Sequence, residues 1–291
     1  MTADAPATPP LKNLDKVYWP EAGFTKGDMI AYYRAIAPVL LPHLAGRPVT
    51  LARFPDGVAG RGWYQTNAVS APPWLRTARI PPARGGGAPL RYAVIDDLAG
   101  LLWAANWGAI ELHPFLATVD DRARPLVLVF DLDPGVPAGI AACAAVAIRV
   151  RGRLARDGLA ACAKTSGGAG LHVYVPMNQA VTFAETKAYG RAVAEELRAE
   201  TPALLAATLA LADRAGRVYI DWRQNDPNRS TIAPYSLRAR RLPAVSTPLT
   251  SSEVEAAAAG NGVPAFSPAE VVARVAAHGD LMAPALVSAS R

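Results

Sequence analysis

Residues 125–135, PLVLVFDLDPG, contain five consecutive apolar residues, two aspartates and a closing Pro-Gly pair. A β-branched and aromatic run of this length that ends in Pro-Gly predicts a strand buried on both faces. Side chains alternate along a strand, so we expect Asp131 and Asp133 on the same face at its end. We expect the fold to be organised around this strand.

The two aspartates suggest a cation site. Neighbouring carboxylates repel each other and lose water on burial, which is costly unless a cation lies between them. Their hard oxygens suit Mg²⁺ or Mn²⁺. The alternative is an exposed strand end whose acids cap a following helix, and this short motif alone leaves both interpretations open.

Composition limits the class of protein. The chain has 291 residues, is 51% hydrophobic and carries a net charge of +6, with 25 arginines among its 30 basic residues. Guanidinium groups bind phosphate oxygens bidentately, so nucleic acid and nucleotides are the expected partners. No apolar run reaches membrane-spanning length and residues 1–10 lack a leader pattern, so we expect a cytoplasmic protein without membrane contact. Cys143 and Cys162 form no Cys-x-x-Cys motif, which fits a reducing compartment.

The sequence shows no internal repeat and no long linker, so we expect a single domain over residues 1–291. Within it we expect an N-terminal arm over residues 1–16, a catalytic core over 17–250 and C-terminal helices over 251–291.

Upstream of the acidic strand, the sequence predicts a helix over residues 26–41 capped by Thr25 and a basic strand over 48–54. Trp63 and Tyr64 follow in a short aromatic segment. Adjacent aromatic residues most often fill a core, but two rings beside a basic strand also suit a stacking platform for bases.

Two further segments carry histidines. Glu111 and His113 are expected on the same face of an extended segment one loop before the acids, although a lone histidine is usually structural. His172 follows the glycine-rich loop KTSGGAG at residues 164–170, on a predicted strand over 171–175. Such a loop lets backbone N–H groups converge on an anion, with Lys164 and Ser166 as further donors, so we interpret it as a phosphate cradle and not only a turn.

The C-terminal half adds a third acid and a pair of arginines. Asp221 lies on an alternating strand predicted over residues 218–223, and Arg238 and Arg240 project together if their segment is extended. Helices are expected over 182–198, 202–212 and 268–277, the last opened by a capping box. Three carboxylates around two cations, facing cationic groups for a triphosphate, are what nucleotidyl transfer requires.

Four motifs in order, DLDPG, TSGGAGLHVYVP, YIDWRQN and APYSLRAR, closely resemble the polymerase domain of bacterial ATP-dependent DNA ligase D, a member of the archaeo-eukaryotic primase superfamily. The resemblance extends over about residues 11–249. It implies a primase-polymerase core of the α/β (α+β) class, with mixed and antiparallel sheets flanked by helices. It also implies catalysis with two Mn²⁺ or Mg²⁺ ions.

The resemblance assigns roles to residues by motif. The metal-binding and catalytic acids match Asp131, Asp133 and Asp221. Groups that contact the nucleotide match His113, Ser166, His172, Arg238 and Arg240, and we add Lys164 beside the glycine loop and Gln224 in the third motif. DNA-contacting groups match Arg53, Trp63 and Tyr64.

The sequence departs from the family pattern at three positions. Ala52, Thr66 and Ala169 stand where the family commonly has lysines that face phosphate, so we expect weak discrimination for a recessed 5′-phosphate. The residues include no lysine nucleophile motif for adenylation, which predicts a stand-alone polymerase.

The expected function is template-dependent extension of DNA ends, or gap filling, with ribonucleoside or deoxyribonucleoside triphosphates. The resemblance implies a preference for ribonucleotides and a role in non-homologous end joining at the nucleoid, with the Ku end-binding protein and a separate ATP-dependent ligase as partners. The alternatives are a primase that starts chains unaided and a DNA-end-binding scaffold with weak catalysis. A glycosyltransferase with an Asp-x-Asp motif would explain Asp131 and Asp133 but not Asp221 with the arginine pair.

Overall fold

The structure, a computed structural model, describes residues 9–82, 87–262 and 265–286. The chain divides into two compact units, each made of three separate segments. The first unit comprises residues 1–121, 230–246 and 266–279, and the second comprises residues 122–229, 247–265 and 280–291. Parts of the expected N-terminal arm and C-terminal region, residues 1–8, 263–264 and 287–291, lie outside the described residues. The single-domain organisation stays a prediction.

The first unit contains a sheet in the order β4-β3-β6-β5, and β7 also pairs with β3. Its strands are β3 (Pro48–Arg53), β4 (Trp63–Gln65), β5 (Thr77–Ile80), β6 (Leu90–Val94) and β7 (Ala109–Pro114), all antiparallel to their neighbours. Two small antiparallel ribbons complete it: β1 (Val17–Trp19) with β2 (Phe24–Thr25), and β12 (Leu237–Arg238) with β13 (Ala244–Val245).

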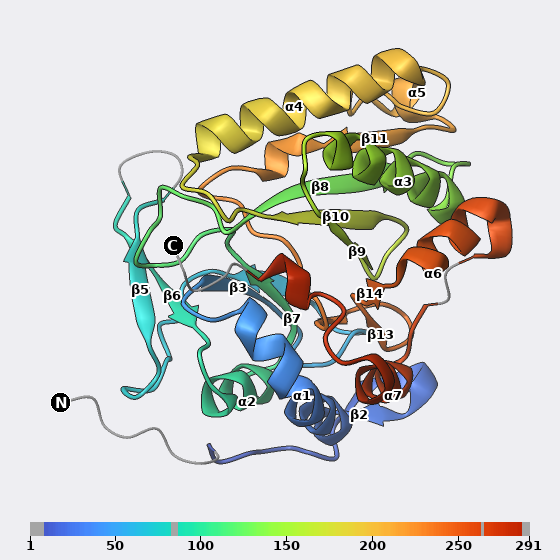
Figure 1. The fold of residues 1–291 in the computed structure, drawn as a ribbon. Helices are drawn as coiled ribbons and strands as arrows, with labels where there is room; N and C mark the ends of the chain where they lie inside the picture. The colour runs from blue at the N-terminus through green and yellow to red at the C-terminus, as the bar shows by residue number, and fades with distance from the viewer. Residues whose placement is uncertain (1–8, 83–86, 263–264, 287–291) are drawn as a thin grey trace. The chain divides into compact units, whose positions relative to one another are not determined.

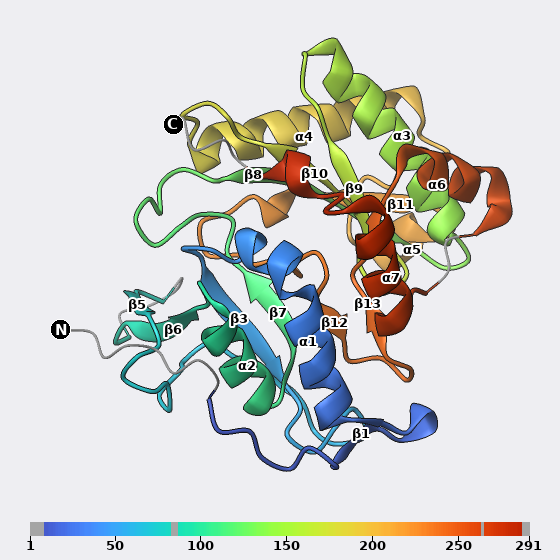
Figure 2. The same ribbon diagram turned by 60° about the horizontal axis from the view of Figure 1, so that its bottom comes forward.

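Of the helices of the first unit, the first and the last begin where the sequence predicts. They are α1 (Lys26–Leu40), α2 (Leu98–Asn106) and α7 (Pro268–His278), and α1 packs against the other two (Figure 2). Thr25 and Ser267 each accept a hydrogen bond from a backbone N–H of the first turn and complete capping boxes, which satisfies donors that a helix start leaves open. The predicted helix over 26–41 and the predicted strand over 48–54 are confirmed.

The second unit contains a five-stranded antiparallel sheet in the order β11-β8-β10-β9-β14 (Figure 1). The strands are β8 (Val127–Pro134), β9 (Cys162–Thr165), β10 (Leu171–Pro176), β11 (Val218–Asp221) and β14 (Pro248–Leu249). The helices are α3 (Ile140–Arg156), α4 (Phe183–Glu200), the short α5 (Leu211–Arg214) and α6 (Ser251–Ala256). Antiparallel sheets flanked by helices confirm the expected fold class.

Strand β8 forms the centre of the second unit, as its apolar run predicts. Residues 127–130 are at most 4% exposed, and α3 and α4 pack against the strand (Figure 1). Leu128 lies directly under Gly190 of α4, so Leu128, Phe130 and Leu132 point toward the helices. Asp131 and Asp133 therefore lie on the opposite face of the sheet.

Short 3-10 turns cover residues 20–22, 41–43, 222–224 and 283–285, and a π-type turn covers 257–261. The expected helix over residues 202–212 is wrong: only α5 is helical there. Its backbone instead pairs with the edge of β11, because Val218 N donates to Leu204 O and Ala206 N donates to Val218 O, each at 2.9 Å. No helix within the described residues is long and apolar enough to span a membrane.

Candidate active site

Four polar side chains form a row across the sheet of the second unit. Backbone register pairs Asp221 of β11 with Asp131 of β8, Asp131 with His172 of β10, and His172 with Lys164 of β9. Directly paired residues of antiparallel strands project to the same face. Asp133 lies two residues further along β8, opposite Tyr219, and shares this face. The three predicted acids are thus brought together, and we call this surface the acid face.

Each acid of the row has a partner within the unit. His172 Nε2 lies 3.2 Å from Asp131 Oδ1, and Gln224 Nε2 donates to Asp131 Oδ2 at 3.3 Å. Asp221 Oδ1 accepts a hydrogen bond from the Arg223 backbone N–H at 3.0 Å. Gln224, which the third motif contributes, therefore reaches the acid face.

The electrostatics of the acid face separate its three carboxylates. Burial raises the pKa of Asp131, but His172, Gln224 and Lys164 outweigh it and leave the pKa below its usual value. Burial, followed by the charges of Asp131 and Asp221, raises the pKa of Asp133 to about 6. Burial and the Asp131 charge also raise the pKa of Asp221. Repulsion between the carboxylates therefore raises the pKa of Asp133 and Asp221, which accept no hydrogen bond from a cationic side chain, but not that of Asp131.

The acid face offers a set of possible ligands for metal ions. Within the described residues, no group of three or more His, Cys, Asp or Glu side chains is already drawn together as a metal site. The donor set nevertheless fits hard divalent cations: three carboxylates share one face, and two have raised pKa values because of burial and mutual repulsion. A cation relieves that repulsion, so Asp131, Asp133 and Asp221 suit the role that the sequence predicts.

The glycine loop borders the acid face. Ser166 N donates to Gly170 O at 3.0 Å, and Ser166 Oγ accepts from Gly168 N at 3.2 Å and Gly170 N at 3.3 Å. A Cβ atom at Gly170 would lie 2.3 Å from the Leu132 carbonyl oxygen, so the loop packs against β8 only with glycine there. Two backbone N–H groups of the loop thus converge on the Ser166 hydroxyl oxygen. That the loop binds phosphate stays a prediction.

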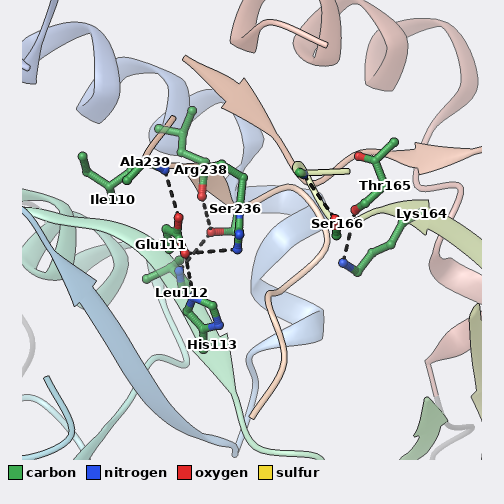
Figure 3. A network of polar contacts seen from close by, with 12 residues as sticks. Ile110, Glu111, Leu112, His113, Lys164, Thr165, Ser166, Ser236, Arg238 and Ala239 are labelled. Carbon is green, nitrogen blue, oxygen red and sulfur yellow. Dashed lines mark hydrogen bonds and ion pairs between the residues drawn. The ribbon is translucent and has the colours of Figure 1, made fainter. Parts of the chain in front are cut away.

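Lys164, the member of the row on β9, is fully buried. Its Nζ donates to the Thr165 carbonyl at 3.4 Å (Figure 3). The same Nζ lies 5.6 Å from the centre of the Tyr174 ring. Tyr174 in turn stacks on His172, with ring centres 6.2 Å apart. Lys164 therefore adds positive charge to the acid face from a buried position in the row, whereas the sequence predicts it as a phosphate donor beside the glycine loop.

In the first unit, a buried carboxylate organises two other predicted residues. Glu111 Oε2 lies 2.9 Å from His113 Nε2 and accepts a hydrogen bond from Arg238 Nη1 at 3.1 Å, while Oε1 accepts from the Ala239 N–H at 2.9 Å (Figure 3). Burial raises the pKa of Glu111, but these partners outweigh it and hold the pKa below its usual value. His113 and Arg238 are brought together by this one side chain.

Arg240 does not share a strand with Arg238. Strand β12 ends at Arg238, and Arg240 N donates back to Arg238 O at 2.9 Å, so the chain turns between them. The condition under which the two side chains would project together, an extended segment, is therefore not met. The short β12–β13 ribbon leaves no partner strand to keep residue 240 extended.

The predicted aromatic platform lies on the surface of the first unit. Trp63 and Tyr64 are 42% and 65% exposed, which excludes the core interpretation. The Arg53 guanidinium lies between two rings, 3.7 Å from the centre of Trp107 and 5.2 Å from that of Trp63, and its Nε donates to Trp107 O. Tyr64 meets His113 edge to face, with ring centres 5.3 Å apart. Arg53, Trp63 and Tyr64 thus occur as one cluster.

The predicted residues accordingly fall into two groups by unit. The second unit holds Asp131, Asp133, Lys164, Ser166, His172, Asp221 and Gln224, and the first holds Arg53, Trp63, Tyr64, His113, Arg238 and Arg240.

Sequence reasoning missed two supporting residues. The sequence predicts Glu111 on the same face as His113 but indicates no role for it. Asn225 is fully buried and exchanges two 2.8 Å hydrogen bonds with the backbone of Val129, which fixes the segment after Asp221 beside β8. Its position in the motif YIDWRQN was the available signal for it.

An antiparallel sheet that carries this row of acids and cations is consistent with the primase-polymerase class of folds. The sequence model described as "LigD, primase-polymerase domain" matches residues 25–282, and the chain belongs to this family. It is 40% identical over 281 residues to the multifunctional non-homologous end joining protein LigD of Mycobacterium bovis, and 30% identical over 254 residues to the bifunctional LigD of Bacillus subtilis.

These alignments cover 94% and 86% of this chain but 36% and 40% of the relatives, so the chain spans somewhat more than a third of their length. A solved structure, the polymerase domain of Mycobacterium tuberculosis ligase D in complex with DNA, matches with a TM-score of 0.88 and 38% identity. That match covers 96% of this chain and 97% of the other. The family resemblance predicted from the four motifs is confirmed.

Proposed function

We propose that the chain is a DNA-directed nucleotidyltransferase that extends DNA ends and fills gaps with nucleoside triphosphates. The observation that carries this proposal is the register that sets Asp221 opposite Asp131, with Asp133 two residues along the same strand face. A binding scaffold gains nothing from three carboxylates that repel one another. Their joint retention on one face therefore favours catalysis.

In this proposal Asp131, Asp133 and Asp221 hold two divalent ions, Mn²⁺ or Mg²⁺. When bound, such ions lower the pKa of the attacking hydroxyl and neutralise charge on the leaving pyrophosphate. Gln224 and His172 keep Asp131 oriented through the contacts described above. The Ser166 hydroxyl accepts from the Gly168 and Gly170 amides, so its own proton is available to a phosphate oxygen beside the acids.

The cluster around Glu111 supports a second role, contact with the nucleotide. His113 and Arg238 carry donors for anionic oxygens, and Glu111 holds both in place. Arg238 Nε has no hydrogen-bond partner within the described residues, so the guanidinium retains donor capacity. Arg240 adds a further cation in this proposal.

The exposed aromatic cluster suits DNA. Trp63 and Tyr64 are exposed to solvent, and Arg53 adds positive charge close to the Trp63 and Trp107 rings. Stacking of bases on such rings tolerates every sequence, as an end-processing enzyme requires. The related domain from Mycobacterium tuberculosis was solved in complex with DNA, which supports DNA binding here.

The names of the relatives support a place in non-homologous end joining. We propose that this chain works there on DNA ends at the nucleoid in the cytoplasm, with Ku and an ATP-dependent ligase activity as partners, and that it prefers ribonucleotides.

A labelled primer–template, incubated with each nucleotide set and with Mn²⁺ or Mg²⁺ in turn, tests this function. The wild type should add nucleotides complementary to the template. The Asp131→Asn variant should add none, while Asp157→Asn, which changes an exposed acid of the same unit, should keep full activity. Equal extension by both variants, or none by the wild type with either metal, contradicts the proposal.

A further inference from the structure

A second cationic site lies in the second unit, outside the acid face. A pocket of about 340 Å³ opens between α4 and the edge strand β11. Three arginines line it, Arg191 and Arg198 from α4 and Arg223 from the turn after β11. None of them belongs to the residues assigned to catalysis. We call this feature the arginine pocket.

Two of the three arginines of the pocket lie over the ring of one tryptophan. Trp222 has the guanidinium of Arg223 5.1 Å from its ring centre and that of Arg191 at 5.7 Å. Arg223 also donates to the Tyr219 hydroxyl. A guanidinium stacked on a ring keeps its N–H groups in its own plane, where they are available to phosphate oxygens. The pocket is therefore arranged for an anion before one arrives.

The pocket keeps an excess of positive charge. Glu195 is the single acid among the described residues that line it, and it is bound by Arg191 Nε at 2.7 Å. Arg198 forms no ion pair with any described residue. Arg191 and Arg198 are seven residues apart on one helix face, which is about 10 Å along the axis. That span exceeds a single phosphate group and suits successive phosphates of one chain.

The arginine pocket lies on the α4 side of the sheet, opposite the acid face, and strand β11 contributes to both. Tyr219, which lines the pocket, pairs in register with Asp133, and the Arg223 backbone donates to Asp221. A polynucleotide whose end lies at the acids must continue past an edge of this sheet. At the β11 edge such a strand would meet the arginines of the pocket.

We propose that the arginine pocket binds the phosphodiester backbone of single-stranded DNA that leads to the acid face. This inference rests on the proposed function for its direction toward the acids, but not for the binding itself. The aromatic face of Trp222 is already used by arginine, so contact is with phosphates and shows no base preference. A concave pocket also admits one strand more readily than a rigid duplex.

The test compares two double variants with the same change in charge. Arg191→Gln with Arg198→Gln alters the pocket. Arg149→Gln with Arg156→Gln alters two exposed arginines with the same seven-residue spacing on α3 of the same unit. Binding of a labelled 15-nucleotide oligo-dT is followed by fluorescence anisotropy in EDTA over a series of salt concentrations, with circular dichroism as the check of folding.

For single strands the log–log salt slope changes by about 0.7 for each phosphate contact. The pocket variant should therefore lose about 1.4 from its slope and bind roughly tenfold more weakly at low salt, while the α3 variant stays near wild type. Equal losses in both variants overturn the proposal, because diffuse charge then explains binding. A pocket variant that loses affinity for ATP or pyrophosphate but not for oligo-dT also overturns it and makes the pocket a nucleotide site. Absence of metal-dependent primer extension by the wild type contradicts the proposed function alone, since binding in EDTA is measured independently.

Discussion

Replacing Asp133 by Asn should abolish nucleotide addition and at the same time stabilise the fold. The pKa of Asp133 is raised from 3.8 to about 6 by burial and by the charges of Asp131 and Asp221. A gap of about 2 pKa units corresponds to about 3 kcal/mol of cost in the charged form. Asp133 is only half-buried, and solvent screening reduces this to about 1–2 kcal/mol. Asn keeps the shape of the side chain and removes the charge.

The gain should depend on pH in a defined direction. Because the folded-state pKa lies above the unfolded value, the wild type loses stability relative to the variant as pH rises from about 4 to 6. Below about pH 4 the carboxyl is protonated in both states, so the difference should vanish. Above about pH 6 it should be constant.

Urea unfolding in EDTA at pH 4 and pH 8 measures this difference directly, and primer extension measures activity. The matched control is Asp157→Asn. Tyr189 and Arg153 donate to that exposed carboxylate and hold its pKa below the usual value, so removing its charge should give no gain. A destabilised Asp133→Asn protein at pH 8, or a gain of equal size at both pH values, would refute the reasoning about repulsion. Full extension activity in this variant would refute the metal assignment.

Three further outcomes are expected. Glu111→Gln should raise the KM for nucleotide and leave DNA affinity unchanged, because His113 and Arg238 lose their buried counter-charge. Steady-state kinetics and a parallel DNA titration measure both quantities. An altered DNA affinity with an unaltered KM would contradict this prediction. Arg240→Ala should weaken nucleotide binding by up to about 1.5–3 kcal/mol, and DNA binding less, in separate titrations; a loss confined to DNA would assign this arginine to the DNA path. Thr66→Lys should increase preference for a gapped substrate with a 5′-phosphate over one with a 5′-hydroxyl, since such discrimination needs fixed cations; strong discrimination by the unmodified protein would mean that other residues supply the pocket. Ala52 is 4% exposed and pairs with Glu111, so it is less suitable for this substitution.

Local rules were sufficient for the central strand and its two acids. The apolar run predicted a buried strand, and the alternation of side chains placed Asp131 and Asp133 on one face. The helix starts at Thr25 and Ser267 also followed from local signals, because capping is a contact between neighbours in sequence.

Long-range pairing decided what the local rules could not predict. Asp221 lies opposite Asp131 only because β11 pairs with β8 in that register, and no periodicity within either strand encodes this. Glu111 meets Arg238 across 127 positions of sequence. The predicted helix over residues 202–212 failed for the same reason, since the Leu204 carbonyl and the Ala206 N–H hydrogen-bond to Val218 at the sheet edge.

The central claim is that Asp131, Asp133 and Asp221 act together as a metal site for nucleotidyl transfer. Titration with Mn²⁺, followed by the electron paramagnetic resonance signal of the free ion in the presence of a nucleoside triphosphate, tests it most directly. The wild type should bind Mn²⁺, and Asp221→Asn should lose most of that binding together with primer extension, while Asp157→Asn should behave as the wild type. Unchanged Mn²⁺ binding and unchanged extension in Asp221→Asn would contradict the account.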